Sequence, residues 1–163
     1  MGRIRKAMIV DLDAHQGNGH ERDFTNDPSV YIFDAYNAYI YPGDTKAMAG
    51  ISKGLPLRMG TATDAYLEKL RQELPDAMEK AQADFLVYNA GTDCLEGDPL
   101  GGLRISAEGI VARDQLVFEE AKKRGMKILM VTSGGYQRNN ARIIADSILN
   151  LERQGLISRT QEE

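Results

Sequence analysis

The sequence is poor in cysteine and histidine. A single cysteine, Cys94, excludes a disulfide framework and favours a reducing, intracellular compartment. Only His15 and His20 offer an imidazole. No apolar run approaches the roughly 18 residues of a membrane span, so we expect no membrane partner. A net charge of −4 argues against direct binding of nucleic acid through phosphate contacts.

What the sequence does contain is an alternation of apolar strand patterns and amphipathic helix patterns. In 163 residues this predicts one domain of the α/β class, a parallel sheet flanked by helices. Pro75 is expected to kink or split one helix, and residues 35–58 are expected to form a long irregular loop. The predicted strands are 7–10, 30–33, 85–88 and 127–132, and the predicted helices are 63–82, 106–124 and 140–152, with a helical turn at 20–24.

Acidic residues follow the predicted strands. Asp11, Asp13 and His15 are spaced by two, which places their side chains on one side of an extended segment. Carboxylate and imidazole ligands suit a divalent transition metal such as zinc. Strand-end aspartates also serve as caps and turn residues, so further carboxylates are needed for a metal site. The available ones are Asp34, Asp93 and Asp98.

Three motifs resemble the histone deacetylase family. DLDAHQGNGHERDF at 11–24 is similar to its central metal motif, NAGTDCLEGDPLGGL at 89–103 to its second metal loop, and VTSGGYQ at 131–137 to its tyrosine loop. The sequences of these motifs are most similar to those of class IV members. The resemblance implies a partial arginase/deacetylase-like three-layer fold. Residues 1–154 would form the C-terminal portion of the catalytic domain, and residues 155–163 a polar tail.

The resemblance also implies roles for individual residues. Asp13, His15 and Asp98 match the zinc ligands, with an open position for water and substrate. Tyr136 matches the tyrosine that donates a hydrogen bond to the developing oxyanion. The activity implied is zinc-dependent hydrolysis of acyl-lysine amides in a peptide or protein, in the nucleus or cytoplasm. The resemblance to class IV also implies removal of longer fatty acyl groups.

Other matched positions surround this set. Asp11, and less strongly Asp34, match positions beside a monovalent cation, expected to be potassium. Tyr41 matches an aromatic wall of the acyl-lysine tunnel, although ordinary loop packing explains it equally well. Gly101 and Gly102 match positions where the backbone approaches the substrate.

The sequence departs from the family in one respect. Members use two adjacent histidines as general base and acid, and none precedes Asp11 here. His15 is assigned to the metal and His20, which has no adjacent histidine, is assigned no chemistry. We therefore expect this chain alone to be a weak or inactive hydrolase. The alternative is a non-catalytic binding module or pseudoenzyme that retains the metal and acyl-lysine pocket.

Two further expectations follow. Part of the sheet should be uncovered and one edge unpaired, which favours an N-terminal partner chain or a homo-oligomer. A remote alternative is a magnesium-dependent phosphatase of the haloacid dehalogenase type, because IVDLD at 9–13 also ends a strand in that class. His15 argues against it, since a small hydroxyl residue is expected there.

Overall fold

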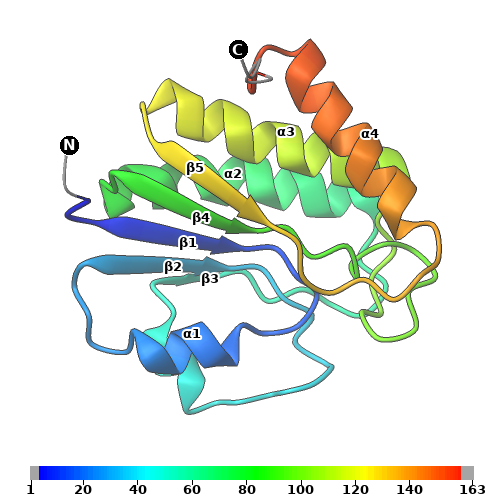
Figure 1. Ribbon diagram of the computed structural model, residues 1–163. Coiled ribbons are helices and arrows are strands. Elements are labelled where there is room, and N and C mark those ends of the chain that lie inside the picture. Colours follow the sequence, from blue (N-terminus) through cyan, green and yellow to red (C-terminus); the bar gives the residue numbers. More distant parts are fainter. Residues whose placement is uncertain (1–3, 159–163) are drawn as a thin grey trace.

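The computed structural model describes residues 4–158 (Figure 1). Five strands form one sheet in which all paired strands run parallel, in the order β3-β2-β1-β4-β5. Their arrowheads point to the same side of the molecule, so the loops that follow the strands gather there. The strands are β1 (Ala7–Asp11), β2 (Val30–Asp34), β3 (Lys53–Gly54), β4 (Phe85–Asn89) and β5 (Lys127–Val131).

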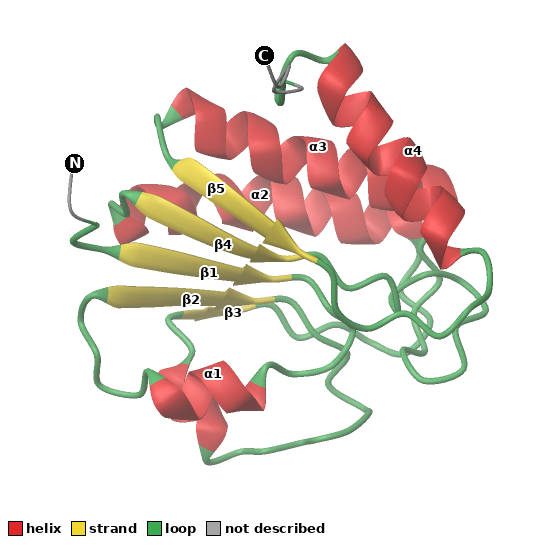
Figure 2. Ribbon diagram, in the orientation of Figure 1, coloured by secondary structure: helices red, strands yellow, loops and turns green. Residues whose placement is uncertain are grey.

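Helices lie on both faces of the sheet (Figure 2), which confirms the predicted fold class. The connections from β1 to β2 and from β3 to β4 run in opposite directions along the sheet. Because parallel crossovers are right-handed, their helices lie on opposite faces. The helices are α1 (Asn18–Asp23) and the 3₁₀ helix η1 (Ala47–Gly50) on one side, and α2 (Thr63–Ala81), α3 (Ala107–Lys123) and α4 (Asn140–Arg153) on the other.

The main core lies between the sheet and α2 and α3. Apolar side chains of β1 and β4 alternate toward this face, because successive strand residues point to opposite sides. The apolar side of α2 is buried against them. The core contains Met8, Val10, Leu86 and Tyr88 from the strands and Leu67, Leu70, Leu74 and Met78 from the helix.

The opposite face of the sheet is covered at β2 and bare at β5. Ile32, Ile9 and Leu129 lie in one register row with Val87, and their exposed fractions are 0%, 9% and 49%. We call Val87, Leu129 and Val131 the bare sheet face. Since β5 also ends the strand order, the expected uncovered surface and unpaired edge are confirmed for the described chain.

Two expectations about local structure need correction, because α2 is not split at Pro75 and residues 35–58 are not irregular throughout. Helix α2 continues through Pro75, and the apolar residues Leu74 and Met78 on either side of it remain buried. The proline carbonyl accepts a hydrogen bond from Arg124 (3.0 Å), which ties this turn to the end of α3. Residues 35–58 are more ordered than expected, because they contain η1 and the two-residue strand β3. A strand of this length is too short to show an alternating pattern.

Of the predicted polar tail, residues 159–163 lie outside the described residues. Over the described part of the chain, no helix combines the length and the apolarity that crossing a membrane requires.

We expect Leu70→Ala to lower the free energy of unfolding by about 2–5 kcal/mol, because the change leaves a cavity between α2 and the sheet. Leu149→Ala on the exposed side of α4 is the matched control and should cost less than about 1 kcal/mol. Urea denaturation measures both. Equal losses in the two variants would contradict the assigned core.

Candidate metal centre

The loops after β1, β4 and β5 bring acidic residues and a histidine together. Single ligand atoms of Asp13, His15 and Asp93 all lie within 4.8 Å of one another. His15 Nδ1 lies 2.8 Å from Asp93 Oδ2 and 3.1 Å from Asp13 Oδ1. Two loops that are about 80 residues apart in sequence therefore meet at one point, as expected for the carboxyl edge of a parallel sheet.

Backbone groups fix these carboxylates. Asp93 is fully buried, and its Oδ1 accepts a hydrogen bond from the Ala14 amide (2.7 Å). Asp13 Oδ2 accepts from the Ser133 hydroxyl (2.7 Å) and the Gly134 amide (2.8 Å). A Cβ at Gly134 would lie 2.2 Å from Asp93 Oδ2, so a side chain there would collide with the carboxylate. The loop after β5 is thus closed over the pair.

Asp98, the third predicted zinc ligand, lies beside this group. Within the described residues, the cluster with ligand atoms inside 4.8 Å contains Asp93 and not Asp98. Asp98 Oδ1 accepts from the amides of Leu100 (2.9 Å) and Gly101 (3.1 Å). Its Oδ2 accepts from the Tyr136 amide (2.9 Å), so Asp98 shapes the tyrosine loop directly.

The carboxylates of this group repel one another unless a positive charge compensates them. Burial and the neighbouring Asp13 charge raise the pKa of Asp93 to about 7. Burial opposes ionisation of Asp13, but hydrogen bonds from its neighbours outweigh it and lower the pKa. Burial also opposes protonation of His15, yet Asp13 and Asp93 raise its pKa overall. Oxygen and imidazole donors around concentrated negative charge fit a divalent ion such as zinc.

A second group lies on the α1 side of the sheet. Asp11 and Asp34, both predicted to flank a monovalent cation, come within 4.8 Å of each other and of His20. Burial raises the pKa of Asp11 to about 7 and that of Asp34 well above its usual range. Asp34 Oδ1 and His20 Nε2 are buried without a hydrogen-bond partner. His20 lies on α1, and its Nε2 is 3.6 Å from Asp11 Oδ2, a contact that sequence spacing did not signal.

A cavity of about 400 Å³ opens onto the first group. Its lining contains the buried Asp13, the partly buried His15 and three exposed residues, Tyr41, Leu100 and Tyr136. The two tyrosines predicted to contact substrate therefore meet at this opening. Leu100 was not predicted, because a single apolar residue after a proline carries no pattern.

The two glycines predicted to approach substrate have reasons inside the protein for being glycine. A Cβ at Gly101 would lie 1.8 Å from the Asp93 carbonyl oxygen. Gly102 has a φ of +65°, and a Cβ there would lie 2.4 Å from Met59 Sδ. Their role toward substrate stays a prediction.

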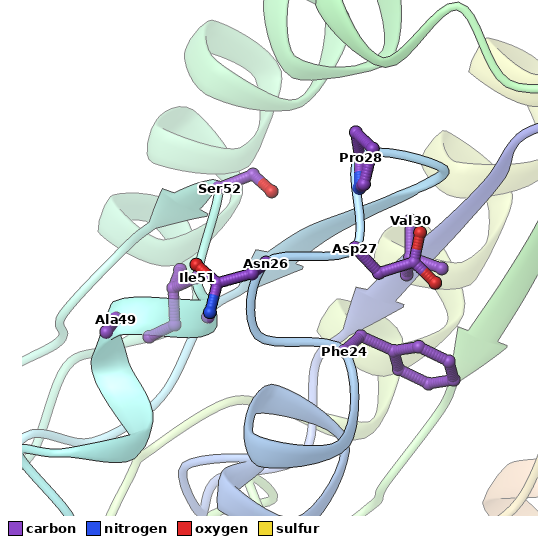
Figure 3. Close-up of a pocket in the computed structure, with 9 residues that line it drawn as sticks. Phe24, Asn26, Asp27, Pro28, Val30, Ala49, Ile51 and Ser52 are labelled. Atoms are coloured by element: carbon purple, nitrogen blue, oxygen red, sulfur yellow. The ribbon is translucent and has the colours of Figure 1, made fainter.

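A different pocket lies between the end of α1 and η1 (Figure 3). Asp27 is the titratable side chain among its described lining residues, and it already accepts hydrogen bonds from the amide and hydroxyl of Ser29. The described residues that line this pocket include no group of metal-binding side chains, so the sheet edge with Asp13 and His15 is the candidate site.

Comparison with known proteins gives a consistent picture. The family model described as "Histone deacetylase domain" matches residues 1–151. Histone deacetylase 2 of Arabidopsis thaliana is 52% identical over 160 residues, covering 98% of this chain and 41% of the relative. An uncharacterized protein of Picosynechococcus is 34% identical over 138 residues, covering 85% of this chain and 45% of the relative.

Solved structures share the fold. The HDA15 HD domain superimposes with a TM-score of 0.77 at 22% identity, covering 96% of this chain and 47% of that one. An acetylpolyamine aminohydrolase from Burkholderia pseudomallei superimposes with a TM-score of 0.77 at 21% sequence identity. The match covers 90% of this chain and 44% of that one. The chain thus spans less than half the length of these relatives.

In metal-free protein, we expect the wild type to lose stability relative to Asp11→Asn as the pH rises from about 4 to about 7. Asp11 loses its proton near pH 3.8 when unfolded but near pH 7 when folded, so rising pH favours the unfolded state. The shift should exceed about 1 kcal/mol. Urea denaturation with a chelator present measures it, and a constant difference across this range would contradict the pKa assignment.

Proposed function

The chain belongs to the histone deacetylase family, and we propose that it forms the metal-binding part of a hydrolase for acyl-lysine amides. The observation that carries this is the group of Asp13, His15 and Asp93 opening into a cavity beside Tyr136. The substrates are acylated lysines of a peptide or protein, and the compartment is the nucleus or the cytoplasm. Within the family we propose membership of class IV, which the motifs at 11–24, 89–103 and 131–137 support by resemblance.

We propose zinc as the cofactor, held by Asp13, His15 and Asp98. When bound, zinc polarises the amide carbonyl and lowers the pKa of water. Asp93 is fully buried with both oxygens close to protein nitrogens, which suits a carboxylate that fixes the His15 ring. Asp98 keeps slight exposure, as Asp13 does, and both accept hydrogen bonds from the tyrosine loop.

Tyr136 stabilises the oxyanion in this proposal. Its ring is exposed at the opening of the cavity, and its amide is anchored on Asp98. Partial burial, and then the nearby Asp93 and Asp13 charges, raise the pKa of its hydroxyl. The phenol therefore stays protonated and donates a hydrogen bond to the negative oxygen that forms on the amide carbon.

The residues around this centre complete the site. We assign Tyr41 to one wall of the acyl-lysine tunnel, and the backbone at Gly101 and Gly102 to substrate contact. Asp11 and Asp34 are proposed to bind a potassium ion, which the unpartnered buried Oδ1 of Asp34 supports.

The bare sheet face is where we expect the group that transfers protons during amide hydrolysis to be supplied. In the register of the sheet, Val131 lies next to Asn89, and Asn89 next to Asp11, so this face runs up to the site. We propose that this face binds an additional polypeptide segment. The longer relatives contain such additional segments outside the part that matches this chain. That segment, in the same longer polypeptide or in a partner, supplies the general base. Residues 1–154 then act as the C-terminal portion of the domain, and these 163 residues alone hydrolyse amides poorly.

We expect purified protein to bind one zinc ion, and Asp98→Asn to weaken zinc binding more than about 100-fold. Asp93→Asn, which alters the support of His15, should weaken it only about 10–100-fold. Competition with a zinc-binding dye measures both, with Glu96→Gln on the same loop as the control. A larger loss in Asp93→Asn than in Asp98→Asn would make Asp93 the ligand instead.

We expect amide hydrolysis to appear when this chain is co-expressed with the part of Arabidopsis histone deacetylase 2 that lies outside the match. Leu129→Lys on the bare sheet face should prevent the complex from forming, because it places a charge in an apolar contact. Ile148→Lys, on exposed α4, is the control and should leave the complex intact. Size-exclusion chromatography and release of acyl groups from an acyl-lysine peptide measure the two effects.

In that complex, Tyr136→Phe should lower the rate by about 10²–10³-fold without changing zinc affinity, since only the hydroxyl is lost. Binding of the acyl-lysine peptide without turnover, in the complex as well as in the isolated chain, would favour the binding-module alternative.

A further inference from the structure

Arg113 of α3 is a charged side chain in the interior of the protein. Its side chain is 0% exposed, and a buried guanidinium is costly unless its partners compensate it. Asp114 does so in part, because its Oδ1 lies 2.9 Å from both Nε and Nη2. The Tyr88 ring lies under the guanidinium, with 5.8 Å between Cζ and the ring centroid.

The remaining nitrogen, Nη1, reaches the two loops of the metal centre. It donates to the carbonyl oxygens of Leu12 (3.2 Å) and Gly91 (2.6 Å) and lies 3.1 Å from Cys94 Sγ. In sequence, Leu12 lies between Asp11 and Asp13, and the Gly91 loop leads into Asp93. One nitrogen thus bonds to the backbone of both loops that carry the candidate zinc ligands.

These two carbonyls need a donor that the sheet does not supply. The paired residues of β1 and β4 end at Asp11 and Asn89, so Leu12 and Gly91 lie beyond the paired registers. A buried carbonyl without a partner is destabilising, and Arg113 supplies donors to both. One rigid, planar group therefore links the two loops from the side of α3, in addition to the hydrogen bond from the Ala14 amide to Asp93.

The guanidinium is itself fixed from other elements. Asp114 accepts hydrogen bonds from the hydroxyls of Tyr88 on β4 and Ser147 on α4 (2.6 Å for Ser147). Helices α3 and α4 and strand β4 thereby converge on the same network. A lysine could not repeat it, because one ammonium cannot pair with Asp114 through two nitrogens and bond to both carbonyls with a third.

We propose that Arg113 is a positioning residue of the metal centre, which fixes the loop of Asp13 and His15 relative to the loop of Asp93 and Asp98 and so determines zinc affinity and ligand geometry. This inference rests on the zinc site of the proposed function. It assigns to a residue without metal contact the task of keeping the ligands at binding distance.

The test compares Arg113→Lys with Arg124→Met in the full chain. Arg124, at the C-terminal end of α3, bonds to Glu120 and to the Pro75 carbonyl, so its loss also removes partly buried contacts of an arginine, but away from the metal centre. Zinc affinity is measured by competition with a chelating dye, ligand geometry by the absorption spectrum of the Co²⁺-substituted protein, and stability by urea denaturation.

We expect Arg113→Lys to weaken zinc binding about 10–100-fold and to change the Co²⁺ spectrum, as loss of a supporting group around a metal does. Arg124→Met should lose stability while its zinc affinity stays within about twofold and its spectrum is unchanged. Should Arg113→Lys not fold, Asp114→Asn, which keeps the arginine but loosens its orientation, should show the same two changes.

Zinc affinity and a Co²⁺ spectrum equal to wild type in Arg113→Lys, or in Asp114→Asn where the lysine variant does not fold, would overturn the proposal. A wild-type chain that binds no zinc would instead overturn the metal site itself and this inference with it.

Discussion

Mutual repulsion among buried carboxylates at one edge of the sheet is the constraint on which the rest of this structure depends. Parallel strands end together, so the acids that follow β1, β2 and β4 cannot avoid one another. Asp11 and Asp93 have pKa values raised to about 7 as a result of burial first and like charge second. Amide donors and His15 offset part of this charge, and the cations that we propose at this edge would compensate the remainder.

The sequence predicted contacts within one segment well and contacts between segments less well. The spacing of two from Asp11 to His15 follows from extended backbone, and the buried stripe of α2 follows from helical period. Whether Asp93 or Asp98 lies nearer to His15 depends on a loop without periodicity, so no pattern distinguishes them. The residues themselves offered Asp93 and Asp98 as candidate carboxylates, and the resemblance to a known family selected Asp98 and supplied Tyr136 and Tyr41. The geometry brought Asp93 to His15 and added His20.

Other features escaped prediction because they depend on the register of distant elements. Strand β3 exists because the Leu55 amide reaches the Asp34 carbonyl and the Ser52 amide reaches that of Ile32, and neither pairing leaves a local signal. From the sequence alone, Arg113 cannot be told from the other charged residues of an amphipathic helix. Its burial becomes evident only once α3 is packed on the sheet, where it lies behind the two loops and bonds to their carbonyls.

The bare sheet face and the buried network of Arg113 act on the site from opposite sides of the sheet. On the α3 side, Arg113 pairs with Asp114 and donates to a carbonyl of each loop, which is the arrangement that we propose fixes the spacing of the ligands. On the other side, burial declines along the row from Ile32 to Leu129. The neighbouring row on the same face runs from Val131 through Asn89 to the buried Asp11. In the proposed function, such a chain provides the metal ligands itself, whereas the groups that transfer protons come from the segment proposed to cover the open face.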